Sequence, residues 1–142
     1  MSNTTLGVVI VHHNRPQLAV RACKSVLHSN EVREVVLVDD ASTVDIGILI
    51  EFCMQSGVKF IQNSSNEYLS SSRRTGLGAL CTTHVLFLDD DDMLYPNKLD
   101  DAFSEVKKAP HIPHTFQTTD SFDGIAQRLE FTYKTRVVRN AT

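Results

Sequence analysis

Four short apolar segments constrain the fold of this chain more than any other feature. They span 6–11, 35–38, 58–61 and 85–88, and the first is rich in β-branched residues. Apolar residues recur at helical spacing in the stretches between and after them, which are 16–29, 46–56, 69–80 and 96–108. Short buried strands that alternate with helices form a parallel sheet with helices on both faces. We therefore predict an α/β, Rossmann-like fold in the order βαβαβαβ, with a mostly parallel sheet.

The chain changes character after Pro110. The stretches 115–119 and 129–138 have the pattern of strands, and Asp123-Gly124 between them is a hairpin-type turn signal. We therefore divide the chain into an α/β core of residues 1–110 and a tail of residues 111–142. The tail is predicted to form a short β-hairpin that belongs to a larger, truncated structure.

Composition places the chain among ordinary globular proteins. It has 142 residues, 42% of them hydrophobic and 22% charged, which suits one domain. The longest apolar runs, such as Val8–Val11, have four residues, far fewer than the roughly 20 of a membrane span. The N-terminus lacks a basic segment and an apolar signal region, so we predict a cytoplasmic location. Three cysteines without CxxC spacing, at positions 23, 53 and 81, are interpreted as reduced packing residues.

Polar clusters stand at the ends of three predicted strands. They are His12–Arg15, Asp39-Asp40 and Asp89–Asp92. Ligands of open α/β sheets bind at the carboxyl ends of the strands, so we predict a site where these clusters meet. Four consecutive carboxylates repel one another, and Mg²⁺ or Mn²⁺ would remove that repulsion. A solvated acidic turn is the alternative interpretation of the same four residues.

The other polar residues allow structural interpretations as well. Asp40 could cap the helix that follows it, a role that suits it better than Asp39. His12 and His13 are a poor metal pair, because adjacent residues of a strand point to opposite sides. Of Arg73-Arg74, one arginine could face the site and neutralise a phosphate while the other is solvated. Residues 106–142 are mildly basic, with six Lys and Arg against three Asp and Glu, which could suit nucleic acid or an anionic surface. Such dispersed charges are more often a solvated face, so no nucleic-acid partner is predicted.

Four motifs in this order resemble the N-terminal, donor-binding half of family 2 glycosyltransferases, which have the GT-A fold. The matching stretches are 8–16 (VVIVHHNRP), 36–43 (VLVDDAST), 66–76 (NEYLSSSRRTG) and 87–99 (FLDDDDMLYPNKL). Their order and spacing agree with the family pattern over residues 6–99, about two thirds of the chain. The resemblance implies a fold that binds a nucleoside diphosphate sugar together with a divalent metal ion.

The resemblance also implies roles for individual residues. A nucleotide-sugar site would be formed by His13, Arg15, Asp39, Asp40, Arg73, Asp89 and Asp90. In such a site His13 stacks on the base, Asp39 or Asp40 contacts it, and Arg73 lies near the diphosphate. Asp89 or Asp90 lies near the ribose, and Asp91 ligates Mn²⁺ or Mg²⁺.

The chain departs from the family pattern at several positions. Val11 replaces a frequent proline, Ala41 and Tyr68 stand at usual glycines, and Arg74 replaces an asparagine. The family's catalytic base belongs to an acidic pair in the second half of the enzyme. The carboxylates after residue 110 are Asp120, Asp123 and Glu130, and none has an acidic neighbour, so no residue is assigned as the base.

The leading functional hypothesis is transfer of a sugar from a UDP-sugar, or another nucleoside diphosphate sugar, to a glycan or lipid-linked acceptor. The reaction would occur in the cytoplasm or at the inner face of a membrane. The chain could also self-associate or pair with a partner subunit. A catalytically incomplete nucleotide-sugar-binding or regulatory module is the alternative. A haloacid-dehalogenase-type phosphatase is disfavoured, because its D-x-D motif follows the first strand and Asp89–Asp91 follow the fourth.

Overall fold

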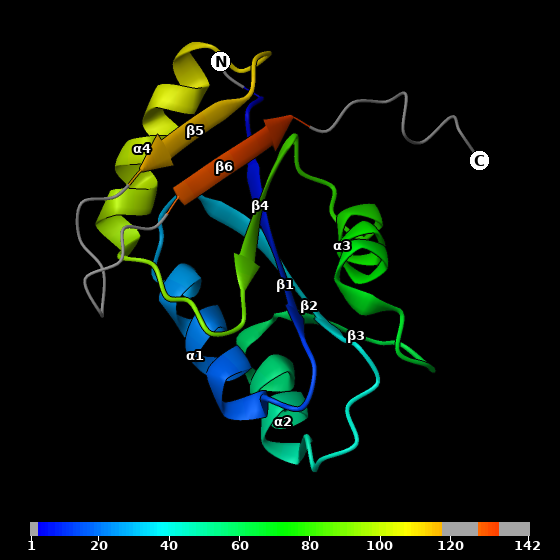
Figure 1. Cartoon of the computed structure of the whole chain (residues 1–142). Helices are drawn as coiled ribbons and strands as arrows, with labels where there is room; N and C mark the ends of the chain where they lie inside the picture. Colours follow the sequence, from blue (N-terminus) through cyan, green and yellow to red (C-terminus); the bar gives the residue numbers. More distant parts are fainter. Residues whose placement is uncertain (1–2, 118–127, 134–142) are drawn as a thin grey trace.

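A six-stranded sheet forms the centre of the computed structural model, which describes residues 3–117 and 128–133 (Figure 1). The strands are β1 (Leu6–His12), β2 (Val32–Asp39), β3 (Lys59–Gln62), β4 (His84–Asp89), β5 (His114–Gln117) and β6 (Arg128–Tyr133). The helices are α1 (Pro16–Leu27), α2 (Gly47–Ser56), α3 (Tyr68–Gly78) and α4 (Pro96–Lys108). The predicted alternation of strands and helices is confirmed, with ends that differ by a few residues.

The strand order is β3-β2-β1-β4-β6-β5, and the first four strands are parallel. The chain builds outward from β1 through β2 to β3 and then returns to place β4 on the other side of β1. The strand order therefore reverses between β1 and β4. Open sheets bind their ligands in the crevice at such a reversal, beyond the carboxyl ends of the strands.

Helices cover both faces of the sheet, as predicted. α1, α2 and α4 pack on one face and α3 packs alone on the other (Figure 1). Side chains of β1 alternate between the two cores, with Val8 and Ile10 on the face of α1 and Val9 on the face of α3. Gly76 lets α3 approach β1 closely, because a Cβ there would lie 2.5 Å from Cγ1 of Val9.

The predicted C-terminal hairpin joins this same sheet. β6 pairs antiparallel with β4, and β5 pairs antiparallel with β6. Phe131 of β6 is buried and its ring lies 5.9 Å from that of Phe103 in α4. The expected Asp123-Gly124 turn, and the expected extensions of the two strands to 119 and 138, lie outside the described residues. Among the helices of the described ranges, none combines the length and the apolar character that crossing a bilayer requires.

The cysteines are free thiols and do not share one environment. Cys23 and Cys53 are buried, and burial raises their pKa values to about 12 and about 11, so both are packing residues as predicted. The prediction is wrong for Cys81, which is exposed. Cys81 follows α3 in the connection to β4, where its backbone N–H donates to the carboxylate of Glu34 at 2.9 Å.

Candidate functional site

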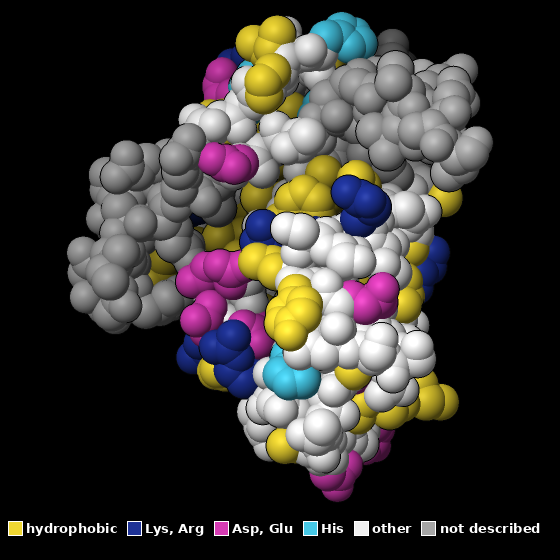
Figure 2. Space-filling model, turned by 45° about the vertical axis from the view of Figure 1, so that its right-hand side comes forward, with side chains coloured by type: hydrophobic (Ala, Val, Ile, Leu, Met, Phe, Trp, Pro, Cys, Tyr) yellow, Lys and Arg dark blue, Asp and Glu magenta, His cyan; other side chains and the backbone are white. Residues whose placement is uncertain are grey.

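A cleft of about 510 Å³ opens at the carboxyl ends of β1 and β4, where the strand order reverses. Its lining residues come from the ends of these strands, from the end of β2 and from the start of α3. They are Val11, His12, His13, Arg15, Asp40, Asn66, Tyr68, Leu69, Asp89, Asp90 and Asp91. Acidic, basic and histidine side chains gather together on this part of the surface (Figure 2).

The structure brings most of the predicted site residues to this one cleft. His13, Arg15, Asp40 and the three carboxylates of 89–91 line it. Asp39 and Arg73 do not line it. Asp39 is fully buried beneath the strand ends, and Arg73 reaches Asp89 from α3. The eight residues therefore divide into a lining set and two residues that contact other parts of the chain.

Asp39 and His12 form a fully buried pair under the cleft. Oδ1 of Asp39 lies 2.8 Å from Nε2 of His12. Burial lowers the pKa of His12 although the Asp39 charge opposes this, so the imidazole is neutral at pH 7. Nδ1 of His12 accepts a hydrogen bond from the backbone N–H of Arg15 at 3.3 Å, which leaves the proton on Nε2, facing Asp39. Asp39 also accepts from Ser42 and, at 3.2 Å, from Nε2 of Gln62.

Asp40 is almost as buried, and its carboxylate holds the start of α3. It accepts the backbone N–H groups of Glu67 at 2.7 Å and Tyr68 at 2.9 Å, and Nδ2 of Asn63 at 3.0 Å. Burial alone would raise the pKa of Asp40, but these hydrogen bonds hold it below its usual value. The expected cap of the next helix is therefore wrong. α2 begins after Ile46 without a side-chain cap, and Asp40 caps the helix after that.

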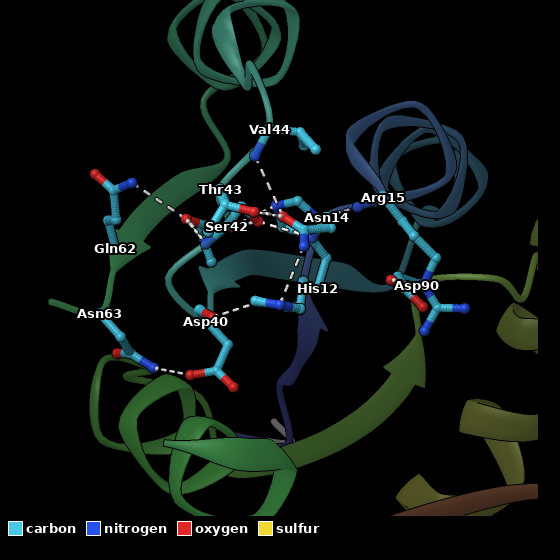
Figure 3. Close-up of polar contacts among 12 residues, drawn as sticks. His12, Asn14, Arg15, Asp40, Ser42, Thr43, Val44, Gln62, Asn63 and Asp90 are labelled. Atoms are coloured by element: carbon cyan, nitrogen blue, oxygen red, sulfur yellow. Dashed lines mark hydrogen bonds and ion pairs between the residues drawn. The ribbon is translucent and has the colours of Figure 1, made fainter. Parts of the chain in front are cut away.

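Hydrogen bonds between Asn14 and residues 42–43 tie the loops after β1 and β2 together (Figure 3). The side-chain oxygen of Asn14 accepts a hydrogen bond from the backbone N–H of Thr43 at 2.7 Å. The backbone N–H of Asn14 donates to Oγ of Ser42 at 2.8 Å. Nδ1 of His13 donates to the backbone carbonyl of Asp40 at 2.7 Å. The imidazole of His13 therefore has a fixed position at the end of β1.

The acidic residues after β4 present oxygen atoms to solvent. Asp89 and Asp91 are exposed and Asp92 is half-buried, and one carboxylate oxygen from each lies within 4.8 Å of the others. Hard divalent cations such as Mg²⁺ and Mn²⁺ take carboxylate oxygens and keep positions for phosphate or water. The grouping therefore fits the cation that the sequence motif implies. Asp90 points inward instead and is 2% exposed.

Two arginines balance this negative charge. Nε of Arg15 lies 3.0 Å from Oδ2 of Asp90, and its Nη1 lies 3.7 Å from Oδ2 of Asp91. Burial raises the pKa of Asp90 more than the Arg15 charge lowers it. Arg73 donates to Oδ1 of Asp89 at 3.0 Å and lies over the ring of Phe87. The neighbouring arginine, 74, is exposed, so only one member of the pair faces this cluster.

Several residues of the site were missed from the sequence. Asn66, Tyr68 and Leu69 line the cleft, and Asp92, predicted only as part of the acidic run 89–92, joins the carboxylates that can hold a cation. One signal was available. The two departures from family glycines, Ala41 and Tyr68, both have left-handed backbone angles, with φ of 57° and 67°. A glycine in a motif indicates a position where the backbone adopts a left-handed conformation. A larger residue at that position places a side chain where the other members of the family have none.

Comparisons with known proteins show the family to which the chain belongs. A family model described as "Glycosyl transferase family 2" matches residues 7–140. An uncharacterized glycosyltransferase of Rickettsia bellii is 34% identical over 103 residues, which are 70% of this chain and 15% of that protein. The chain spans between 15% and 36% of the length of the curated relatives it matches.

Solved structures share the fold at low sequence identity. S. aureus TarS 1-349 in complex with UDP-GlcNAc is 23% identical, with a TM-score of 0.67 over 79% of this chain and 33% of TarS 1-349. The mannosyltransferase PcManGT from Pyrobaculum calidifontis, in complex with GDP-Man and Mn²⁺, is 15% identical, with a TM-score of 0.75 over 96% of this chain and 46% of PcManGT. The sheet order, the cleft and the family match lead to one conclusion: this chain belongs to glycosyltransferase family 2 and has the GT-A fold.

Proposed function

We propose that the cleft binds the nucleoside diphosphate sugar donor of a glycosyltransferase, with a uridine nucleotide favoured. The observation that carries this proposal is the grouping of Asp89, Asp91 and Asp92 beside Arg15 and Arg73 at the strand-order reversal. Carboxylates and arginines that lie in and beside one cleft suit a ligand that brings a cation and phosphates together. A diphosphate ester bound through Mn²⁺ or Mg²⁺ is such a ligand.

The base end of the donor is assigned to the lining residues near the end of β1. His13 offers a fixed ring for stacking, and Asp40 lines the cleft beside it. Asp39, the other candidate for contacting the base, is fully buried and engaged with His12. We therefore assign contact with the base to Asp40 and the support of the surrounding loops to Asp39.

The diphosphate end is assigned to the residues after β4. Asp91, with Asp89 and Asp92, would hold the cation, which when bound withdraws electron density from the diphosphate leaving group. Arg15 is paired with Asp90 and Asp91, and Arg73 with Asp89, so two guanidinium groups lie beside the acidic group and could neutralise phosphate oxygens. Asp90, held inward by Arg15, is assigned to the ribose side.

The comparisons support a nucleoside diphosphate sugar as the donor and leave the identity of its nucleobase open. TarS 1-349 was solved with UDP-GlcNAc, and PcManGT with GDP-Man and Mn²⁺. Residues 1–110 would form the donor half, and residues 111–142 would begin the acceptor side. A glycan or lipid-linked acceptor, and action in the cytoplasm or at the inner face of a membrane, belong to the same proposal.

Calorimetric titration with UDP and Mn²⁺ tests the donor site directly. Wild type should release or absorb measurable heat, and Asp91→Ala should bind at least about tenfold more weakly, because one cation ligand is lost. Asp101→Ala, which removes an exposed carboxylate of α4, is the matched control and should bind like wild type. A GDP titration measures the base preference. No heat with wild type, or equal binding by Asp91→Ala, would sink the proposal.

A catalytically incomplete binding module remains the second candidate. Among the described residues after Asp92, no carboxylate lines the cleft, so none is in place as the base that would deprotonate an acceptor. This candidate predicts binding of UDP-GlcNAc with no UDP release across a panel of glycan and lipid-linked acceptors. UDP release that depends on an acceptor would exclude it.

A further inference from the structure

Tyr68 has a backbone shape that its side chain disfavours. It is the first residue of α3 and has a φ of 67°, where a Cβ is crowded and glycine is the usual residue. The family that the sequence resembles has glycine at this position. A tyrosine here persists only if its surroundings impose the conformation, and such residues concentrate at functional sites.

Hydrogen bonds from the backbone N–H groups of Tyr68 and of the residue before it impose this conformation. Its own N–H lies 2.9 Å from Oδ2 of Asp40 and 3.3 Å from Oδ1 of Asn66. The preceding N–H, of Glu67, donates to the other oxygen of Asp40 at 2.7 Å. These hydrogen bonds, the clamp from Asp40 and Asn66, hold the backbone alone. The Tyr68 side chain is 73% exposed. Internal packing therefore does not explain the aromatic ring at this position.

The ring lies at the candidate donor site. Tyr68 and His13 line the same cleft, one from the start of α3 and the other from the end of β1. Both are fastened to Asp40, Tyr68 through the carboxylate and His13 through the backbone carbonyl. Asp40 is the residue assigned to the nucleobase, and both aromatic side chains line the cleft together with it.

We infer that Tyr68 is a nucleotide-recognition residue whose phenol ring stacks on the nucleobase of the donor, as a second aromatic surface beside His13. This inference rests on the proposed function, since it needs a nucleotide in the cleft. It assigns a role to a side chain that the family pattern lacks. The left-handed backbone and the exposed ring then have one explanation: the clamp from Asp40 holds the ring where the base binds.

Four substitutions separate the ring from the backbone. Tyr68→Phe keeps the ring, Tyr68→Ala removes the ring and keeps the crowded φ, and Tyr68→Gly removes both. In titrations with UDP and Mn²⁺ we expect Tyr68→Phe to bind within about twofold of wild type, and the Ala and Gly variants about tenfold more weakly. Inorganic pyrophosphate with Mn²⁺, which has no base, should bind all of them equally.

The fourth substitution and a stability measurement give independent readouts. The chain has no tryptophan, so Tyr68→Trp introduces a single indole whose fluorescence should be quenched by UDP and not by pyrophosphate. Tyr68→Gly should unfold at a temperature about 3 °C higher than Tyr68→Ala, because it relieves the backbone. The glycine variant would then be the more stable of the two and equally impaired in binding UDP.

Contrary results separate two failures. If wild type binds UDP and Tyr68→Gly binds it equally well, the stacking role is overturned and the donor site stands. If the Ala and Gly variants lose pyrophosphate affinity to the same degree as UDP affinity, the residue acts on the diphosphate and the inference is overturned. If wild type binds neither ligand, the proposed function fails, and the inference fails with it.

Discussion

Two acidic strand ends that look alike in the sequence have opposite environments in the structure. Asp39-Asp40 ends β2, and Asp89–Asp92 ends β4, each directly after a buried apolar strand. Asp39 and Asp40 are at most 4% exposed, and both carboxylates accept hydrogen bonds from their own chain. After β4, only Asp90 is buried. The other carboxylates of that group reach the surface.

The difference follows from the number of donors that the fold supplies around each strand end. β2 lies between β1 and β3, so the residues after it are surrounded by the loop after β1, by Asn63 and by the start of α3. The carboxylates after β4 meet two arginine side chains and the open cleft. An acidic strand end whose carboxylates accept N–H groups from several loops holds those loops in place, whereas an exposed one is available to a cation.

The strongest test of this contrast is Asp40→Ala. It leaves the N–H groups of Glu67 and Tyr68 and the amide of Asn63 without their acceptor in a largely buried position. We expect the free energy of unfolding to fall by about 3 kcal/mol, measured in urea. Asp40→Asn, which keeps one acceptor oxygen, should lose less. A loss below about 0.5 kcal/mol for the alanine variant, the range of an ordinary surface substitution, would contradict the structural role.

Asp91→Asn tests the other side of the comparison. Removing one of several exposed carboxylates should leave the metal-free protein as stable as wild type, within about 0.5 kcal/mol. Wild type at a Mn²⁺ concentration 100 times the dissociation constant gains about 2.7 kcal/mol, a stabilisation that the variant should lack. Thermal unfolding with Mn²⁺ and with EDTA measures both quantities. An equal metal-dependent shift in the two proteins would refute the assignment of Asp91.

The sequence predicted the architecture and the location of the cleft well, for a physical reason. The alternation of buried strands and amphipathic helices leaves few sheet topologies, and the carboxyl ends of the parallel strands meet at one edge. His13, Arg15 and the carboxylates from 89 to 91 could be placed at that edge because each follows a strand directly. The C-terminal hairpin was predicted from its turn signal, but its pairing with β4 through β6 is a long-range contact that local patterns do not contain.

The sequence could not separate the buried carboxylates from the open ones. That distinction depends on residues far along the chain, such as Glu67 for Asp40 and Gln62 for Asp39. The role of Asp40 as a cap was foreseen, but for the wrong helix, because its partners are 27 and 28 residues away and not three. Exposure of Cys81 was missed for the same reason, since apolar character alone does not show which way a loop residue faces.

The buried side of the comparison also predicts a pH dependence. Burial lowers the pKa of His12, the partner of Asp39, and of His84, which is buried at the start of β4. Both folded pKa values lie below the usual value of 6.5, so the unfolded chain takes up protons first. Stability should be complete above pH 6.5 and fall as the pH decreases below it, by at most about 1.4 kcal/mol per pH unit for each histidine.

Urea unfolding at several pH values between 7.5 and 5 measures this slope, as an order-of-magnitude test of the two histidines. His12→Asn should lower the free energy of unfolding at every pH. The result that tests the prediction is its dependence on pH, which should have a shallower slope than in wild type. Asp91→Asn, from the open cluster, should keep the wild-type slope in this range. A wild-type slope of zero between pH 6.5 and 5 would mean that neither imidazole is held neutral.

Arg73→Gln should give the smallest effect on folding. The guanidinium is paired with Asp89, but the two side chains are 35% and 53% exposed, so solvent screens most of their attraction. The contact with the ring of Phe87 adds a further small contribution. We expect the free energy of unfolding to fall by about 0.5 kcal/mol in Arg73→Gln. In Arg73→Lys, which keeps the charge, it should fall by no more than that. Binding of UDP with Mn²⁺ should weaken clearly in Arg73→Gln.

A loss of stability as large as that of Asp40→Ala would show that the strand end after β4 is also structural, and the distinction between the two acidic clusters would then fail.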